Sequence, residues 1–436
     1  MNVYKSSFLI LGKGVTYKHC KKFFDENSIT YISIDTSEVI EIKNNKITTT
    51  QECQKRIKQK SINLKTIDYV LVSPGIPREQ DFIKKIIKSH CKITTDIDII
   101  QNIIKSKLIC ITGTNGKTST VSLLAEILNQ NNKKAIACGN NGISVFEALN
   151  DSYEYVVLEI SSYQLEYIQN LKSEVSVILN ITNDHLDRHV TFEKYLEVKS
   201  KILCNARYTV TNNYFSLENN NIFDIKDNYF YINNSKIEYL KLYKFNYIKY
   251  KEKKYSISGR HEAFNLCACI AILNLLDIDI NQIVSSFEKR TILPHRVEFV
   301  SKYNDIIFIN DSKSTNVSSI KNALTSINDN NIILIMGGDN KKTSYQSLNN
   351  IINDNVKLLV LIGDNCDQIN TEISANVKRK SFKYLEEATE YIFGEMKSGD
   401  TVLFSPGSSS FYMYNNFEDR GNHFKKIVNE YVNSKG

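Results

Sequence analysis

The sequence lacks any apolar run that approaches the ~18 residues a membrane-spanning helix needs, so we expect no membrane insertion. Its start, MNVYKSSFLILGKG, has only a brief apolar segment that is typical of a first strand. The nine cysteines show no paired spacing. Cys267 and Cys269 lie two apart but lack a second pair or His partners at zinc spacing, which argues against a thiolate metal site. Unpaired thiols suit the reducing cytoplasm, where we expect the protein to lie.

A strong charge of either sign is also missing. The formal net charge of +7 attracts acidic substrates but does not require a nucleic acid as partner. One stretch, KLYKFNYIKYKEKKY from Lys241 to Tyr255, interleaves lysines with aromatic residues, as surfaces that bind single strands do. An edge hairpin whose outward lysines oppose aggregation explains the same pattern, and we favour it. With no internal repeat or low-complexity linker, we expect a globular monomer that binds no nucleic acid.

What the sequence does contain is three successive sets of short apolar strands that alternate with amphipathic helices. The first set includes SFLILG and DYVLVSPG, the second LICITG and YVVLEIS, and the third IIFIND and NIILIMGGD. Near-continuous Ile, Val and Leu runs are typical of parallel strands buried on both faces. A length of 436 residues also indicates about three domains. We therefore predict an α/β protein with a Rossmann-like domain at 1–99, a P-loop ATPase-like domain at 100–293 and a second Rossmann-like domain at 294–436.

The stretch CITGTNGKTSTVSLL carries the clearest chemical signal. After an apolar strand, Gly113 and Gly116 let backbone N–H groups turn toward an anion. Lys117 supplies positive charge for phosphate oxygens, the Thr118 hydroxyl suits Mg²⁺, and a helix from about Ser119 adds its positive dipole end. Only two residues separate the two glycines, whereas the common P-loop has four.

Polar residues after the neighbouring strands are candidates to complete this site. Glu159 ends the strand YVVLE, where P-loop proteins often present an acid to the metal, although a solvated strand-end Glu is the alternative. His185, in NDHLDRH, is either a ligand or a capping residue. Lys199 and Lys201, in EKYLEVKSKIL, would by residue type alone lie on a solvated helix face.

The chain resembles the Mur ligases over essentially its whole length. The motifs that carry the resemblance, in the family's order, are GTNGKTST, LEISSYQLE, NITNDHLDRH, SGRHEAFN, LPHRVE, NDSKSTN, GGDNKK and SPGSSSFYMYNNFEDRG. The family uses the shorter loop, GTxGK followed by Ser or Thr, which accounts for the glycine spacing. Among its members, the chain is most similar to those that join D-glutamate to UDP-N-acetylmuramoyl-L-alanine. The resemblance implies a cytoplasmic, ATP-dependent step of peptidoglycan precursor synthesis through an acyl phosphate.

The resemblance also implies roles for individual residues. Lys199, rather than Lys201, would take up CO₂ as a carbamate and bind the second of two Mg²⁺ ions beside His185. The implied catalytic residues are Lys117, Glu159, His185 and Lys199, and the implied metal ligands are Thr118, Glu159, His185 and Lys199. The implied ATP-binding residues are Gly113, Thr114, Asn115, Gly116, Lys117, Thr118, Ser119, Asn265, Arg296 and Asp311. The UDP-substrate is assigned to Val15, Thr16, Asp35, Thr36, Gly75 and Asn140, and D-glutamate to Lys313, Thr315, Lys341, Ser410, Phe411 and Phe417.

Two positions depart from the family pattern, and other functions stay open. Glu262 stands where the family usually has Asn, and Ser37 where an Arg can occur. Gly12, Gly14 and Asp35 form a partial dinucleotide fingerprint, so a nicotinamide-dependent oxidoreductase is one alternative. A nucleotide-controlled binding module, a Mur-type ligase for another amino acid and a folylpolyglutamate synthase-like ligase are the others. The absence of a DNPR motif disfavours the diamino-acid ligase.

Overall fold

The computed structural model describes residues 1–36, 39–43, 46–53, 56–89, 91–213, 221–243, 247–257, 259–291, 293–327, 329–339, 344–411 and 413–435. The chain forms two compact units. The first comprises residues 1–224, 232–234 and 268–287, and the second residues 225–231, 235–267 and 288–436. The three-domain boundaries expected at 99/100 and 293/294 stay a prediction.

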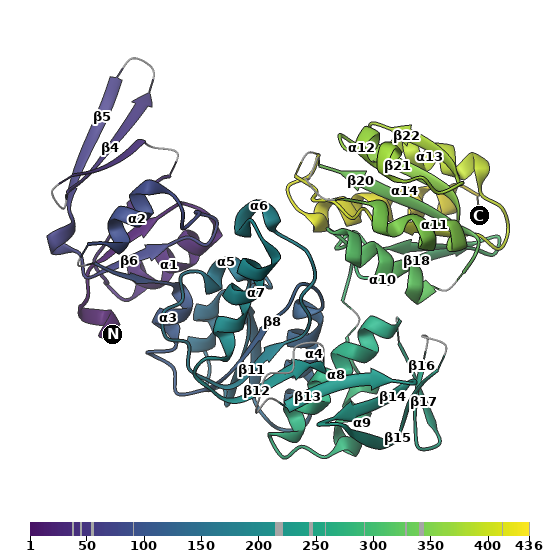
Figure 1. Ribbon diagram of the computed structural model, residues 1–436, viewed down its shortest axis with the longest axis horizontal. Coiled ribbons are helices and arrows are strands. Elements are labelled where there is room, and N and C mark those ends of the chain that lie inside the picture. The colour runs from purple at the N-terminus through teal and green to yellow at the C-terminus, as the bar shows by residue number, and fades with distance from the viewer. Residues whose placement is uncertain are drawn as a thin grey trace. The chain divides into compact units, whose positions relative to one another are not determined.

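The first sheet of the first unit contains four parallel strands in the order β2-β1-β6-β7 (Figure 1). Their bounds are β1 (Phe8–Leu11), β2 (Tyr31–Ile34), β6 (Tyr69–Val72) and β7 (Lys92–Thr94). Every residue of β1 is buried, as expected for a strand covered on both faces. The helices of this region are α1 (Val15–Glu26), α2 (Asp81–Ile87) and α3 (Asp96–Ile100). The predicted alternation of strand and helix is therefore confirmed here.

A three-stranded antiparallel sheet between β2 and β6 was not predicted. It consists of β3 (Val39–Lys43), β4 (Lys46–Cys53) and β5 (Arg56–Asn63). Figure 1 shows β4 and β5 as long paired strands. The stretch mixes Thr, Lys and Gln with isolated isoleucines, so it lacks the continuous apolar runs by which the other strands are recognised.

The second sheet of the first unit carries the phosphate loop. It belongs to a sheet of ten described strands, in which the five parallel strands of this unit follow the order β12-β11-β8-β10-β9. Their bounds are β8 (Lys107–Thr112), β9 (Ala135–Gly139), β10 (Tyr155–Glu159), β11 (Ser173–Ile178) and β12 (Ala206–Asn212). The helices between them are α4 (Lys117–Gln130), α5 (Ser162–Leu165), α6 (Leu186–His189) and α7 (Phe192–Ser200). Because the strands are parallel, the residues after β8, β9, β10 and β11 share one edge.

Further elements lie where the two units divide the chain or just beyond. β13 (Asn221–Lys226), β14 (Tyr229–Ile232), α8 (Arg260–Asn274) and α9 (Ile280–Glu288) run across the dividing residues. In the second unit, β15 (Ser235–Tyr243), β16 (Tyr247–Tyr250) and β17 (Lys253–Ser256) are antiparallel, and β17 is an edge strand. The predicted edge hairpin with outward lysines is therefore confirmed for the described residues of this stretch.

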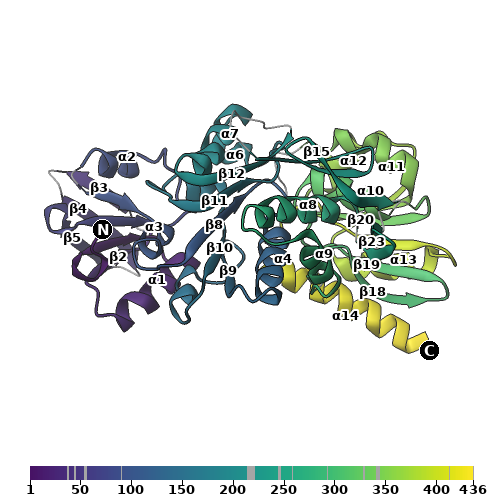
Figure 2. The same cartoon turned by 90° about the horizontal axis from the view of Figure 1, so that it is seen from below.

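The main sheet of the second unit has six strands in the order β18-β19-β23-β20-β21-β22. Only the β18–β19 pair is antiparallel. The strands are β18 (Glu298–Tyr303), β19 (Ile306–Asn310), β20 (Ile332–Gly338), β21 (Val356–Gly363), β22 (Lys378–Phe382) and β23 (Thr401–Phe404). Helices α10 (Val317–Ile327), α11 (Asn349–Asn355) and α12 (Cys366–Glu372) pack on one face, and α13 (Leu385–Glu395) and α14 (Phe417–Lys435) on the other (Figure 2). This is the doubly wound arrangement that the third set of apolar strands predicts.

Candidate active site

The phosphate loop has the backbone geometry expected of an anion site. Gly116 is the N-cap of α4 and has a φ of 83°, a conformation that favours glycine. A Cβ on Gly113 would lie 3.1 Å from the Cβ of Leu179, so the loop passes close to the end of β11. Helix α4 starts at Lys117, two residues before the expected start. The positive end of its dipole and its free N–H groups therefore meet the loop.

Residues after β11, which were not predicted to belong to the site, fix the shape of the loop. The Asn115 N–H donates to Asn180 Oδ1 at 2.9 Å, and Asn180 Nδ2 donates back to Asn115 O at 3.0 Å. The Thr114 hydroxyl accepts from the Thr182 N–H at 3.0 Å and hydrogen-bonds the Tyr195 hydroxyl at 3.2 Å. These contacts join residues 65 or more positions apart, and such long-range pairs leave no local pattern in the sequence. The motif NITND, which contains Asn180 and Thr182, was the one available signal.

Lys199 lies beneath this loop. Its side chain is 1% exposed, and its Nζ donates to Thr112 Oγ1 at 3.1 Å and to Gly113 O at 2.9 Å. Burial, followed by repulsion from the Lys117 ammonium, holds the pKa of Lys199 well below its ordinary value. Lys201 is exposed. A buried lysine with a depressed pKa is the type of amine that reacts as a nucleophile.

Lys117, at the start of α4 after β8, and Glu159, at the end of the neighbouring strand β10, lie at the same edge of the sheet. Lys117 Nζ donates to Gly113 O at 2.7 Å and Thr114 O at 2.9 Å. Glu159 is 2% exposed, and its Oε1 accepts from Asn140 Nδ2 at 2.9 Å. Its other oxygen, Oε2, is buried and has no hydrogen-bond partner among the described residues. A buried carboxylate oxygen in this situation is suited to a cation.

His185 lies at the start of α6 in a strained conformation. Its φ of 54° is rare for a residue with a side chain. Its Nδ1 hydrogen-bonds the Tyr163 hydroxyl at 3.0 Å, and its Nε2 lies 3.7 Å from Asp184 Oδ2. The described part of the chain contains no group of three or more His, Cys, Asp or Glu placed to hold a metal. The predicted ligands, which include a threonine and a lysine, do not form such a group, and they stay a prediction.

The residues expected to hold the UDP-substrate lie at the carboxyl edge of the first sheet, except Asn140, which follows β9 of the second sheet and donates to Glu159. Val15 and Thr16 begin α1 after β1, Asp35 and Thr36 follow β2, and Gly75 follows β6. Because β2, β1 and β6 are adjacent and parallel, these segments are neighbours. Ser73 Oγ, also after β6, is buried and has no partner among the described residues. A Cβ on Gly12 would lie 2.8 Å from this Oγ.

The remaining nucleotide residues belong to the second unit, apart from the phosphate loop. Asn265 in α8 and Asp311 after β19 are buried, and Arg296 precedes β18. Asp311 accepts from Ser405 Oγ at 2.8 Å and from the Val297 N–H at 3.2 Å. Burial raises the pKa of Asp311 to about 7. Glu262, the departure from the family pattern, accepts from Arg290 Nε at 2.5 Å.

The described D-glutamate residues follow β19 (Lys313 and Thr315), follow β23 (Ser410 and Phe411) or begin α14 (Phe417). Lys313 Nζ lies 3.6 Å from the centre of the Phe417 ring. Thr315 follows Ser314, whose Oγ is buried without a partner in the described part of the unit. Ser410 is buried and Phe411 is exposed. Lys341 and the departure at Ser37 lie outside the described residues.

Arg420 organises these loops and was not predicted. It is 1% exposed, and it donates to Ser408 O at 2.9 Å, Ser409 O at 3.1 Å and Ser312 O at 2.7 Å. It therefore connects the segment after β19 to the segment after β23. Buried arginines are rare, and nothing in the motif FEDRG indicates burial.

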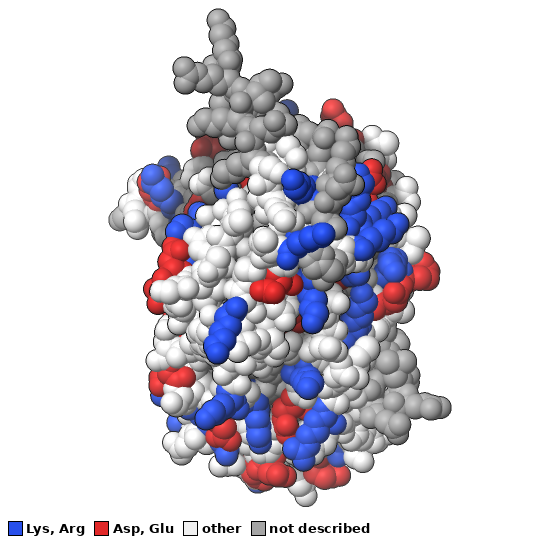
Figure 3. All heavy atoms as spheres, turned by 90° about the vertical axis from the view of Figure 1, so that its left-hand side faces the viewer, with Lys and Arg blue, Asp and Glu red and all other residues white. Residues whose placement is uncertain are grey.

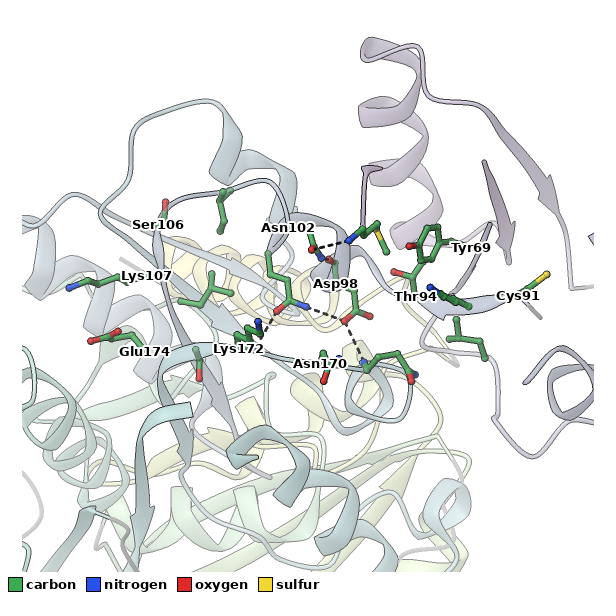
Figure 4. Close-up of a pocket in the computed structure, with 18 of the residues that line it drawn as sticks. Tyr69, Cys91, Thr94, Asp98, Asn102, Ser106, Lys107, Asn170, Lys172 and Glu174 are labelled. Atoms are coloured by element: carbon green, nitrogen blue, oxygen red, sulfur yellow. Dashed lines mark hydrogen bonds between the residues drawn. The ribbon is translucent and has the colours of Figure 1, made fainter. Parts of the chain in front are cut away.

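A cavity of about 820 Å³ lies elsewhere in the first unit (Figure 4). Its lining includes Tyr69, Thr94, Asp98 and Lys172. None of the predicted site residues lines it. It lies by the starts of β6, β7, β8 and β11, away from the edge that carries the phosphate loop.

The surface carries charges of both signs. Figure 3 shows Lys and Arg interspersed with Asp and Glu on one face, with broad areas that have neither. Among strands β15, β16 and β17, Lys249 pairs across the strands with both Lys241 and Lys254. Among the residues the structure describes, no helix is both long and apolar enough to span a membrane.

Comparison with known proteins shows similarity to the Mur ligases along most of the chain. Residues 111–273 match the Mur ligase middle domain, and residues 295–407 match the Mur ligase, glutamate ligase domain. The UDP-N-acetylmuramoylalanine–D-glutamate ligase of Thermoanaerobacter pseudethanolicus is 33% identical, with 97% of this chain and 98% of the relative covered. The ligases of the same name from Geobacter metallireducens (33% identical, 83% of each chain) and Protochlamydia amoebophila (31%, 98% of each) are similar too.

Solved structures share the fold. The UDP-N-acetylmuramate–alanine ligase MurC from Thermotoga maritima matches with a TM-score of 0.60 at 16% identity, covering 98% of this chain and 100% of that one. The MurF ligase from the same organism, in complex with ADP, matches with a TM-score of 0.59 at 14% identity, covering 99% of each chain. At these identities the likeness establishes the α/β architecture.

Proposed function

Because the chain belongs to the Mur ligases, and within them to the UDP-N-acetylmuramoylalanine–D-glutamate ligases, we propose that it joins D-glutamate to UDP-N-acetylmuramoyl-L-alanine through an acyl phosphate. It is an ATP-dependent ligase of peptidoglycan precursor synthesis. Membership of this family argues against the two alternatives from other classes, the nicotinamide-dependent oxidoreductase and the nucleotide-controlled binding module. The cytoplasmic location and the monomeric state stay predictions.

One observation supports the proposal at all three substrate regions. Only four buried side-chain polar atoms in the described chain have no hydrogen-bond partner: Ser73 Oγ, Glu159 Oε2, Ser314 Oγ and Asn370 Oδ1. The first three lie at or shortly after the ends of strands, in the regions assigned to the UDP-substrate, the phosphates and D-glutamate. An orphaned buried polar atom costs free energy, so it is expected where a ligand supplies the partner.

ATP and Mg²⁺ are the cofactors of Mur ligases, and the residues of the phosphate edge fit them. Glu159 Oε2 offers a buried anionic oxygen, and Thr118 lies in the first turn of α4, beside the loop. We assign Thr118, Glu159, His185 and a modified Lys199 as ligands of two Mg²⁺ ions. Bound there, Mg²⁺ would neutralise phosphate charge and polarise the reacting oxygens.

The state of Lys199 fits a carbamate. Its depressed pKa leaves a larger share of neutral amine than an ordinary lysine has. That neutral amine attacks CO₂: an N–C bond forms, one C–O π bond breaks and the nitrogen loses one proton, so the neutral amine becomes a carbamate anion. The anion would lie close to Lys117, whose charge favours it. It would also turn a buried lysine into an oxygen ligand of the kind Mg²⁺ prefers.

The protein's side chains then have two separate tasks, to stabilise the phosphoryl transfer and to bind D-glutamate. A carboxylate is a poor electrophile because oxide is a poor leaving group, and transfer of the γ-phosphoryl group supplies a good one. Lys117 and the N–H groups of the loop offset the repulsion between the substrate carboxylate and the γ-phosphate. The amine of D-glutamate attacks the acyl phosphate and phosphate leaves. Lys313, Thr315, Lys341 and Ser410 are suited to the two carboxylates of D-glutamate, since each needs charge-assisted donors.

Substrate-dependent phosphate release tests this assignment. Purified protein with ATP, Mg²⁺ and UDP-N-acetylmuramoyl-L-alanine is given D-glutamate, L-glutamate, L-alanine or a diamino acid in turn. We expect release only with D-glutamate, and none when the UDP-substrate is omitted. Equal release with L-glutamate or L-alanine would contradict the specificity, and release without any amino acid would contradict the ligase assignment.

A further inference from the structure

Arg188 is an arginine of helix α6 with a buried side chain, three residues after His185. Its side chain is only 8% exposed. Its Nε donates to both oxygens of Glu166, at 3.0 and 3.2 Å, and its Nη2 lies 2.5 Å from Glu166 Oε2. Neither residue has a role in the chemistry described above. A buried ion pair by itself is weak evidence of stabilisation, so the other contacts of the guanidinium decide what it does.

The guanidinium also binds one short segment of backbone. It donates to the carbonyls of three consecutive residues: Pro74 at 3.3 Å, Gly75 at 3.2 Å and Ile76 at 2.7 Å. The Tyr167 hydroxyl donates to the Ile76 carbonyl as well, at 2.8 Å. This segment, residues 74–76, follows β6 and includes Gly75, which is assigned to the UDP-substrate. Only a planar group with several fixed N–H donors can serve three carbonyls and a carboxylate at once.

The guanidinium also packs over the ring of Tyr163, the residue that contacts the candidate metal ligand His185. The Arg188 guanidinium carbon lies 4.9 Å from the centre of the Tyr163 ring. The hydroxyl of that ring hydrogen-bonds His185 Nδ1 at 3.0 Å. Arg188 and His185 are also only one helical turn apart. One side chain therefore contacts both the backbone of residues 74–76 and the ring that orients His185.

We propose that Arg188 is a positioning residue that holds residues 74–76 in register with Tyr163 and His185. It would thereby place the carboxylate end of the UDP-substrate against the phosphate edge. This inference rests on the proposed function, because it takes residues 74–76 as part of the UDP-substrate site. Glu166 helps to hold Arg188 in place, because its carboxylate accepts hydrogen bonds from the guanidinium. Glu166 Oε1 also lies 3.4 Å from His189 Nδ1.

The test compares Arg188→Ala with wild type in the phosphate-release assay. We expect kcat/KM for the UDP-substrate to fall about 100-fold, as when a substrate is displaced by about 1 Å, while KM for ATP is unchanged. Guanidinium ion, at concentrations far below those that unfold proteins, should restore activity to this variant, and methylammonium should not. The matched control is Arg207→Ala, which removes an exposed arginine paired with Glu174 and should behave as wild type with or without guanidinium.

Two variants that each delete a single oxygen atom test separately the contact with residues 74–76 and the contact with His185. They also keep the proposal testable if Arg188→Ala does not fold. Tyr167→Phe removes one hydrogen bond to Ile76 O and should weaken UDP-substrate binding about fivefold, measured by calorimetry without Mg²⁺. Tyr163→Phe removes the His185 contact and should lower kcat while leaving that binding unchanged.

The results that would contradict the positioning role of Arg188 differ from the result that would contradict the proposed function. If wild type shows no release with D-glutamate, the proposed function fails. If wild type is active and a folded Arg188→Ala variant keeps wild-type kcat and KM, the positioning role is wrong. It is also wrong if guanidinium gives no rescue while KM for ATP rises as much as KM for the UDP-substrate. Wild-type binding by Tyr167→Phe together with wild-type kcat in Tyr163→Phe would overturn it as well.

Discussion

Substituting Lys199 by methionine is expected to remove most of the activity while changing stability little. The Nζ of Lys199 makes two hydrogen bonds, to Thr112 Oγ1 and Gly113 O, each with a net contribution of about 1 kcal/mol. Neither partner is left orphaned. Thr112 Oγ1 still donates to Ile160 O at 2.8 Å, and Gly113 O still accepts from Lys117 Nζ at 2.7 Å. Methionine also keeps the volume of the buried stem, so no large cavity forms.

The loss in the free energy of unfolding should therefore stay below about 2 kcal/mol, which corresponds to a decrease in Tm of a few degrees. Alanine at Lys199 should cost more, about 2–5 kcal/mol, because it leaves a cavity. Activity should behave differently. If a carbamate on Lys199 is a metal ligand, both variants should lose it completely, and phosphate release should fall by at least about 100-fold.

The assay combines thermal denaturation with phosphate release in the presence and absence of acetate or propionate. The short acid should enter the cavity of Lys199→Ala and restore part of the activity, whereas the filled site of Lys199→Met should not respond. Lys201→Ala is the control, since that residue is exposed. Near-normal activity in Lys199→Met, or rescue of Lys201→Ala instead, would refute the reasoning.

Three further predictions follow from single contacts. Burial raises the pKa of Asp311 from 3.8 to about 7, so between about pH 4 and pH 7 the folded state binds more protons than the unfolded state. The free energy of unfolding therefore falls as pH rises through this range. Asp311→Asn should remove up to about 4 kcal/mol of this pH dependence, which is checked by measuring Tm against pH for wild type and variant. Gly139→Ala would press a Cβ against the Glu159 carbonyl oxygen at a φ of 106° and should cost about 2–3 kcal/mol, whereas Gly394→Ala in α13, with open space around it, should gain up to about 1 kcal/mol. The midpoints of urea denaturation would report both changes. Glu159→Gln should raise the Mg²⁺ concentration needed for half-maximal phosphate release at least about tenfold, because it removes the charge of the orphaned oxygen; an unchanged Mg²⁺ titration would exclude Glu159 as a ligand.

The parallel strands of both units were predictable because their sequences carry a signal that depends on neighbouring residues alone. β8, β10, β20 and β21 are rich in Ile, Leu and Val, and each runs directly into a polar or glycine-bearing turn. The phosphate loop was predictable for the same reason. The β3–β5 sheet was missed because its strands are mostly polar and gain their stability from pairing with each other.

Residue type alone could not separate Lys199 from Lys201, since both lie in one lysine-rich stretch. Two positions apart on a helix, their side chains point in very different directions, and only the packing of α7 shows which one is buried. Arg188 and Arg420 were missed for a related reason. Arginine is usually exposed, and their partners are backbone carbonyls, many of them more than 100 residues away in sequence, which no local pattern reveals.

The most direct measurement of the central claim is the fate of radiolabelled D-glutamate. With ATP, Mg²⁺ and UDP-N-acetylmuramoyl-L-alanine, the label should move into a UDP-linked product, and one ADP and one phosphate should form for each glutamate incorporated. If every reactant is present and the label stays in free glutamate, or if ADP forms without incorporation, the account of this protein as a D-glutamate ligase is wrong.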